Sequence, residues 1–231
     1  MTNTANSHPQ AWYDKRADCL AEFITPQRYR TLMAALAMRT RYMTLLTENL
    51  FHPHNASALM RHCDAFGVQE FHTVETRCKF QPNASIVRGT DKWIDVRRHP
   101  STAEALAALR AEGYRLVATT PHRESCTPET FDVTRGPFAL IFGTEHAGIS
   151  QEAMAAADEY LRIPMCGLVE SLNVSASAAI LIYMLSERVR QQVEGWQLPP
   201  LEAAAARLRW MVAAVRGAQE ILDRNFPDDG D

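Results

Sequence analysis

The side chains with the clearest capacity for chemistry lie between residues 160 and 185, in the stretch YLRIPMCGLVESLNVSASAAILIYML. Its first residues are strand-like and stop at Pro164, which cannot donate to a sheet ladder. A loop around Gly167 follows, and the pattern then becomes helical. Ser171 and Asn173 stand at the helix entry, where their side chains can bind free backbone N–H groups. The spacing alone is typical of a capped, tightly packed helix.

Two further groups of polar residues follow predicted strands. Asn55 is placed to cap a helix, and Arg61 lies about one and a half turns later. Glu145 stands between Gly143 and Gly148, which permit positive φ and close approach of another backbone. Taken singly, these residues are compatible with a cap, a surface ion pair and a solvated acid.

Hydrophobic periodicity predicts strands that alternate with helices. The first two strands flank a helix, which predicts a parallel pair with a right-handed crossover. Thr25 and Pro26 mark the start of an earlier helix, and Ser101 with Glu104 forms a capping box. The strands are expected at 43–50, 68–74, 93–96, 114–120, 138–142 and 160–163. The helices are expected at 11–24, 26–40, 55–66, 83–89, 101–113, 150–158, 172–195 and 201–226.

Parallel strands end at a common edge of the sheet, where open α/β sheets bind ligands. This rule places Thr119, the segment Gly143–Gly148 and the segment Ile163–Leu172 along one edge. No G-x-G-x-x-G, Walker A motif or metal-ligand spacing occurs, and Ser171 has no evident Ser-His-Asp partners. The sequence therefore offers no candidate for a dinucleotide site, a P-loop or a metal centre.

Length and composition favour a cytosolic α/β protein. The chain has 231 residues, of which 46% are hydrophobic, enough for a substantial core. No apolar run approaches a membrane span, and the polar N-terminus lacks a signal-peptide core. The five scattered cysteines, without C-x-x-C, indicate reduced thiols. We therefore expect a cytoplasmic location.

The net charge of −3 does not mark a nucleic-acid binder, but the cations are clustered. Between Arg77 and Arg98 there are six basic residues and two acidic ones, and Arg28 to Arg41 contains four arginines and no acid. Such clusters can bind phosphates, and they can equally be solvated faces. The candidate RNA contacts are Arg28, Arg30, Arg39, Arg41 and Arg88.

Three segments together resemble the motifs of the SpoU/TrmH family of SPOUT RNA 2′-O-methyltransferases, in family order. The first runs from His54 to Val68 and resembles H-N-x-x-A-x-x-R-x-x-x-A-x-G-V. The second, FALIFGTEHAGIS, resembles L-x-x-G-x-E-x-x-G-[IL]. The third, IPMCGLVESLNVSAS, matches IPM-x-G-x-x-x-SLNVS almost letter for letter. The T-P-x-R helix and the C-terminal helix are most similar to the TrmH branch, which methylates guanosine 18 in the tRNA D-loop.

The resemblance implies a mostly parallel sheet flanked by helices, with a C-terminal trefoil knot, in an obligate homodimer. Residues 1–24 would be a polar extension, 25–196 the methyltransferase domain and 197–231 a helical extension. S-adenosylmethionine would bind in the knot, and no metal is implied. The implied cofactor-lining residues are Thr119, Gly143, Ile163, Met165 and Leu172. The implied catalytic residues are Arg61, Asn55, Glu145, Ser171 and Asn173.

Arg61 would lie at the reacting hydroxyl, where an arginine, almost always protonated, suits phosphate binding and stabilisation of a developing alkoxide. Whether it also accepts the proton stays open. The chain departs from the family pattern at Thr144, His146, Ala147 and Glu170. These departures leave ribosomal RNA open as the substrate. A catalytically idle RNA-binding scaffold and a small-molecule α/β enzyme are the alternatives from other classes.

Overall fold

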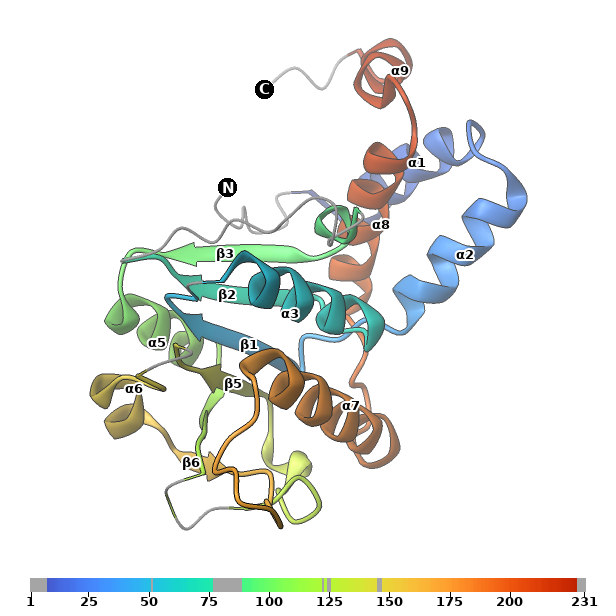
Figure 1. Ribbon diagram of the computed structural model, residues 1–231. Helices are drawn as coiled ribbons and strands as arrows, with labels where there is room; N and C mark the ends of the chain where they lie inside the picture. The colour runs from blue at the N-terminus through green and yellow to red at the C-terminus, as the bar shows by residue number, and fades with distance from the viewer. Residues whose placement is uncertain are drawn as a thin grey trace. The chain divides into compact units, whose positions relative to one another are not determined.

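The computed structural model describes residues 8–50, 52–76, 89–121, 123, 126–144 and 147–227. The chain divides into two compact units (Figure 1). One unit comprises residues 40–196, and the other combines residues 1–39 with 197–231. This division differs from the expected boundaries, because the helix after Thr25 belongs with the chain termini rather than with the sheet.

The unit of residues 40–196 is built on a six-stranded sheet in the order β3-β2-β1-β5-β4-β6, in which every strand pair is parallel. This confirms the predicted fold class. The strands are β1 (Met43–Glu48), β2 (Glu70–Val74), β3 (Asp95–His99), β4 (Arg115–Thr119), β5 (Phe138–Phe142) and β6 (Glu159–Leu161). The helices are α3 (Pro53–Ala65), α5 (Thr102–Ala111), α6 (Gln151–Ala156) and α7 (Val174–Gln192), with 3-10 turns η1 (Thr90–Lys92) and η2 (Val133–Arg135).

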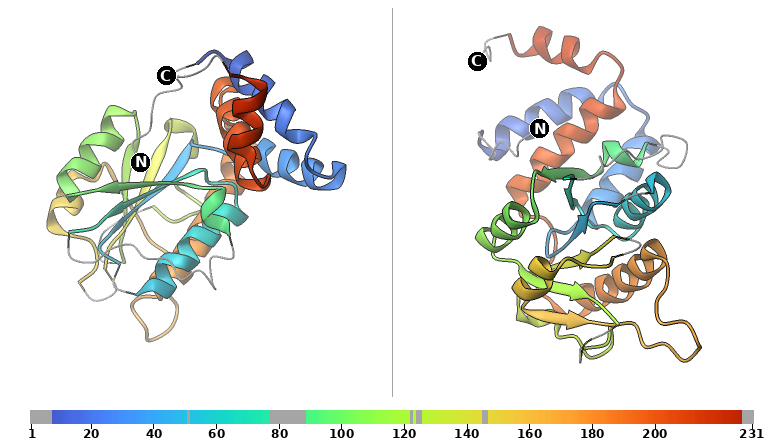
Figure 2. Two further views of the ribbon diagram at one scale, coloured as in Figure 1. Left: turned by 90° about the horizontal axis from the view of Figure 1, so that it is seen from above. Right: turned by 60° about the vertical axis from the view of Figure 1, so that its left-hand side comes forward.

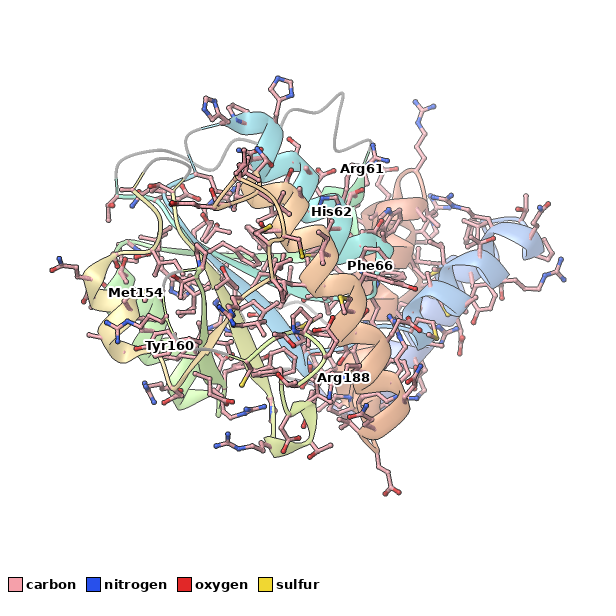
Figure 3. The ribbon with its side chains drawn as sticks, turned by 60° about the horizontal axis from the view of Figure 1, so that its bottom comes forward. Arg61, His62, Phe66, Met154, Tyr160 and Arg188 are labelled. Atoms are coloured by element: carbon pink, nitrogen blue, oxygen red, sulfur yellow. The ribbon has the colours of Figure 1, made fainter. Side chains whose placement is uncertain are left out.

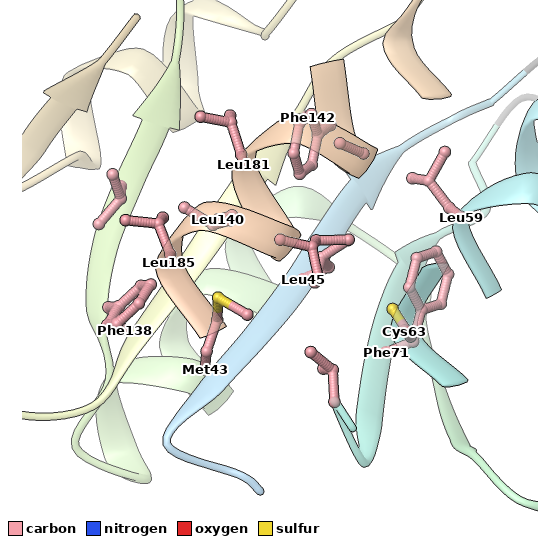
Figure 4. Close-up of a cluster of buried hydrophobic side chains, with 14 of the residues drawn as sticks. Met43, Leu45, Leu59, Cys63, Phe71, Phe138, Leu140, Phe142, Leu181 and Leu185 are labelled. Atoms are coloured by element: carbon pink, nitrogen blue, oxygen red, sulfur yellow. The ribbon is translucent and has the colours of Figure 1, made fainter. Parts of the chain in front are cut away.

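Helices α3 and α7 cover one face of the sheet, and α5 and α6 cover the other (Figures 1 and 2). Successive side chains of a strand point to opposite faces, so each buried strand feeds both layers. Leu45 packs with α3 and α7, whereas Leu46 packs with α5 and α6. Figure 4 shows the first layer, in which Leu185 of α7 lies near Met43 and Leu181 lies near Phe142. The sheet core thus fixes α3 and α7 on the same face.

The other unit contains four helices among its described residues: α1 (Gln10–Ala21), α2 (Pro26–Ala37), α8 (Pro200–Ala214) and α9 (Ala218–Asn225). The predicted cap of α2 is confirmed, since the Thr25 side chain accepts from Arg28 N at 3.2 Å. Arg207 of α8 pairs with Asp14 and Asp18 of α1 and donates to the Tyr29 hydroxyl of α2 at 2.7 Å. One arginine therefore links three helices.

The single predicted C-terminal helix at 201–226 is wrong. The helix is broken after residue 214, and Gly217 adopts a φ of +69° before α9 begins. This left-handed conformation suits glycine and ends a helix. The predicted helix at 83–89 lies mostly outside the described residues. Where the structure describes the chain, no helix is long and apolar enough to cross a bilayer. Cys19, Cys126 and Cys166 are free thiols.

Candidate functional site

A pocket lies at the carboxyl edge of the sheet, where the segments after β4 and β6 meet the start of α7. Residues that line it come from both segments and from α7: Thr119, Thr120, Pro121, Leu161, Arg162, Ile163, Met165, Glu170, Ser171, Leu172, Ser177 and Leu181. The expected meeting of Thr119 with the segment Ile163–Leu172 is therefore found, whereas the segment Gly143–Gly148, expected at the same edge, supplies no described residue to the pocket. Of the candidate cofactor residues, Thr119, Ile163, Met165 and Leu172 line the pocket and Gly143 does not.

Gly143 instead allows the next loop to fold back on itself. A Cβ on Gly143 would lie 1.9 Å from the carbonyl carbon of Gly148. Thr144 and Gly148 exchange two backbone hydrogen bonds, of 2.9 and 3.1 Å, and Gly148 has a φ of +70°. The two glycines thus serve different purposes, since one needs space and the other a left-handed backbone. The candidate Glu145 falls outside the described residues.

Asn55 and Asn173 are brought together by the packing of α3 and α7. Asn173 Nδ2 donates to Asn55 Oδ1 at 3.2 Å. Asn173 Oδ1 also accepts from Ser175 N at 2.8 Å, which confirms Asn173 as the cap of α7. The predicted capping role of Asn55 is wrong, because α3 begins at Pro53 and its N-cap is His52. Asn55 is instead 8% exposed inside the first turn, facing α7.

Arg61 lies on the exposed side of α3. It is not among the residues that line the pocket. In Figure 3, Arg61 and Tyr160, which precedes the pocket loop, lie on opposite sides of α7. Six residues of α-helix rotate a side chain by about 240°, so Arg61 and Asn55 point in different directions. The structure therefore joins Asn55 to Asn173 and places Ser171 in the pocket, whereas Arg61 does not line that pocket.

The candidate RNA contacts divide into two kinds. Arg28 and Arg30 are exposed on α2 and remain candidates. Arg39 is only 2% exposed and lies over the Trp210 ring at 5.0 Å, so burial removes it as a phosphate contact. Arg41 is corrected as well, because its guanidinium pairs with Glu70 and Asp95. Arg88 lies outside the described residues.

Glu70, His72 and Glu112 have ligand atoms close enough to suggest a metal site. However, Arg97 already donates to Glu70 at 2.9 Å and also pairs with Glu112. The positive charge that balances these two carboxylates is therefore the Arg97 guanidinium rather than a metal ion. Burial, followed by the charge of Arg97, lowers the pKa of His72 to about 3, so His72 is neutral beside these arginines. Its Nδ1 lies 2.9 Å from His99 Nε2.

Several residues at this edge are not identified by any sequence motif. Thr120, Ser177 and Leu181 line the pocket, and no local motif singles them out. Glu48, at the end of β1, is 3% exposed and binds Ser150 and Thr102. A lone acid after an apolar strand is the only sequence signal for Glu48, and that signal is common.

Most of the pocket and both paired asparagines lie within a segment that matches a known family model. Residues 42–183 match the model of the SpoU rRNA Methylase family. The match spans more than half of the chain, from β1 into α7, and includes all three motif segments. The chain belongs to the SpoU methylase family.

Two relatives that share most of their length with this chain carry the same name. The chain is 32% identical over 207 residues to a tRNA (guanosine(18)-2′-O)-methyltransferase of Borreliella burgdorferi, covering 90% of this chain and 94% of the relative. It is 38% identical over 170 residues to the enzyme of that name from Thermus thermophilus, covering 74% and 86%.

Solved structures agree with the sequence relatives. The A. aeolicus TrmH/SpoU tRNA modifying enzyme superposes with a TM-score of 0.73 at 28% identity, covering 82% of this chain and 98% of that chain. The SpoU methyltransferase AviRb from Streptomyces viridochromogenes, in complex with the cofactor AdoMet, gives a TM-score of 0.54 at 25% identity, covering 71% and 62%.

Proposed function

We propose that this protein transfers a methyl group from S-adenosylmethionine to a ribose 2′-hydroxyl of RNA, with guanosine 18 of the tRNA D-loop as the target. The observation that carries the proposal is the pocket at the carboxyl edge, formed by the segment of the third motif and the end of β4. The names of relatives that share most of their length with this chain support tRNA as the substrate.

The residues of the pocket fit the proposed cofactor. Apolar side chains of Ile163, Met165 and Leu172 suit an adenine ring, and nearby backbone groups can bind its edge. The pocket also contains one basic and one acidic side chain, Arg162 and Glu170. When bound, S-adenosylmethionine would supply a sulfonium-activated methyl group, so the protein's task is binding and orientation.

The reacting hydroxyl is a poor nucleophile that must lie in line with the methyl group. In the proposal, Arg61 binds the phosphate next to the target ribose and stabilises the developing alkoxide. Proton acceptance by Arg61 stays open. Asn55, Asn173, Ser171 and Glu145 would orient the nucleotide and the loops. The hydrogen bond between Asn55 and Asn173 supports a shared role for the first and third motifs.

The proposal includes a homodimer. Apolar side chains are exposed near the pocket and on α7, where a second copy could cover them: Leu168, Val169, Leu172, Ile180 and Tyr183. A second copy would also supply an Arg61 from outside, which suits the separation of Arg61 and Tyr160 in one chain (Figure 3). A cytoplasmic location, expected from the sequence, fits tRNA as the substrate.

The trefoil knot implied by the family fold is also part of the proposal. Arg188 of α7 donates to the carbonyl oxygens of Pro128 and Phe131, each at 2.6 Å. The same loop continues at Cys126 into a parallel bridge with Leu161 at the end of β6. These contacts hold α7 and β6 against one loop, which supports the proposed knot.

The test is incubation with labelled S-adenosylmethionine and unmodified tRNA or ribosomal RNA transcripts, followed by nuclease mapping. Label on a D-loop ribose supports the whole proposal. Label on ribosomal RNA keeps the chemistry and replaces the substrate. Cofactor binding without any transfer to either RNA would instead favour an idle scaffold.

A further inference from the structure

The pocket at the carboxyl edge has two charged lining residues, and they are of opposite sign. Among the described residues that line it, Arg162 is the basic one and Glu170 is the acidic one. Both are exposed, and within the described part of the chain neither side chain forms an ion pair or a hydrogen bond. Arginines elsewhere in this unit, such as Arg110 and Arg115, pair with nearby carboxylates. The two charges at the pocket are therefore open to a ligand.

The backbone that carries each charge is held in place by a neighbouring element. Arg162 follows β6 directly, and its N–H donates to the carbonyl oxygen of Cys126 at 3.0 Å. Glu170 lies three residues before Asn173, the cap of α7. The two charges thus lie near opposite ends of the 162–173 loop, one beside the sheet and one beside the helix. A ligand with one charge of each sign can meet both without reorganising these ends, which lowers the entropic cost of binding.

S-adenosylmethionine has such a pair of charges at its methionine end, where an α-carboxylate and an α-ammonium group are both ionised at neutral pH. We infer that Arg162 binds this carboxylate and that Glu170 binds this ammonium group. A guanidinium can donate two parallel N–H bonds to a carboxylate, and a carboxylate accepts from an ammonium group. The inference rests on the proposed function. It gives a role to Glu170, where the chain departs from the family pattern.

The test uses ligands that lack these charged groups in turn, with each Kd measured by calorimetry. Arg162→Gln should raise the Kd for S-adenosylmethionine about tenfold, the scale of one charge-assisted hydrogen bond. It should leave the Kd for decarboxylated S-adenosylmethionine unchanged, because that ligand has no carboxylate. Glu170→Gln should raise both Kd values about tenfold, because both ligands keep the ammonium group. Neither variant should change the Kd for 5′-methylthioadenosine, which lacks the whole amino-acid end.

Two exposed residues outside the pocket provide matched controls. Glu152→Gln and Arg224→Gln each remove one charge of the same sign as the test variants, and they should leave every Kd unchanged. S-adenosylhomocysteine has the amino-acid end without the sulfonium charge. If Glu170 binds the ammonium group, Glu170→Gln should weaken this ligand as much as S-adenosylmethionine. A loss confined to S-adenosylmethionine would overturn the role of Glu170, because it would place the sulfonium beside that carboxylate.

The remaining outcomes separate this inference from the proposed function. Equal losses of affinity for S-adenosylmethionine and 5′-methylthioadenosine would overturn the inference, because they would show a disturbed loop rather than a lost charge contact. Unchanged affinity for S-adenosylmethionine in Arg162→Gln or in Glu170→Gln would refute the role of that residue. Absence of S-adenosylmethionine binding by the wild-type protein would instead remove the proposed function.

Discussion

Asn55 and Asn173 are 118 residues apart in the chain, and their side-chain amides form a hydrogen bond of 3.2 Å. The bond joins the first turn of α3 to the first residue before α7. Both helices lie on the same face of the sheet, and their apolar sides share one core. Packing in this core therefore sets the distance between the starts of α3 and α7, and it brings the two amides within hydrogen-bond distance.

We predict that the hydrogen bond between Asn55 and Asn173 contributes to methyl transfer independently of the capping of α7 by Asn173. Serine caps helices as well as asparagine, but its side chain is too short to reach Asn55. Asn173→Ser should keep the melting temperature and lower the rate of methyl transfer about tenfold, on the order of one hydrogen bond with its orienting effect. Single-turnover kinetics together with thermal unfolding measures both. An unchanged rate would show that Asn173 acts only as a cap.

Arg61 is predicted to act in the chemical step rather than in cofactor binding, because it lies outside the pocket. Arg61→Ala should lower kcat by at least about 100-fold, as loss of an electrostatic contact to a developing oxyanion predicts. The affinity for S-adenosylmethionine should stay unchanged by calorimetry. Arg110→Ala provides the control, since Arg110 is a half-exposed arginine that pairs with Asp158 on α5's side of the sheet. Full turnover by Arg61→Ala would exclude the role.

Gly143 should not tolerate even one added carbon. A Cβ there would lie 1.9 Å from Gly148, so the loop must move, and overpacking of this kind costs about 1–3 kcal/mol. We expect Gly143→Ala to weaken S-adenosylmethionine binding about tenfold. Gly167→Ala is the matched control, because a Cβ on Gly167 has no neighbour within 4 Å. Equal affinities for the two variants would contradict this account of the loop.

The buried histidine pair predicts a loss of stability in mild acid. Burial, with the neighbouring cations, lowers the pKa of His72 from 6.5 to about 3 and that of His99 to about 4. Below pH 6.5 the unfolded chain therefore binds more protons than the folded protein. The free energy of unfolding should fall as the pH drops, by up to about 1.4 kcal/mol per unit for His72. It should be constant, as far as these histidines are concerned, above pH 7.

Urea unfolding at pH 7.5, 6.5 and 5.5 measures this dependence, and His72→Gln provides the comparison. Glutamine can keep a hydrogen bond to His99 but does not titrate. The slope between pH 6.5 and 5.5 should be smaller in the variant. A wild-type stability that is flat across this range would contradict the lowered pKa values of His72 and His99.

Much of the fold follows from local signals. The strand at 138–142 is an unbroken apolar run and is wholly buried, and Gly67 ends α3 with a φ of +79° as its position suggests. The boundary of the units was not predictable from the same signals. Thr25 and Pro26 fix where α2 starts, but they do not show that α2 packs with α8, as the hydrogen bond from Arg207 to Tyr29 does.

The candidate site, too, could be predicted only in part from local sequence signals. The third motif identifies Ser171 and Asn173, and the end of β4 supplies Thr119 to the same pocket. The partner of Asn173 could not be inferred, because Asn55 reads locally as a cap, whereas the N-cap of α3 is His52. Arg39 and Arg41 read as free cations until Trp210 and Glu70 are seen beside them. These interactions join residues that are far apart in the chain, and the spacing of residues in a single sequence does not reveal such pairs.

The most direct test of the central claim replaces one oxygen in the RNA. The enzyme is incubated with labelled S-adenosylmethionine and two tRNAs that differ only at guanosine 18, which carries ribose in one and 2′-deoxyribose in the other. The account predicts label on the ribose form and none on the deoxy form, with both tRNAs bound equally. Label on the deoxy form, or on neither tRNA while S-adenosylmethionine binds, would contradict it.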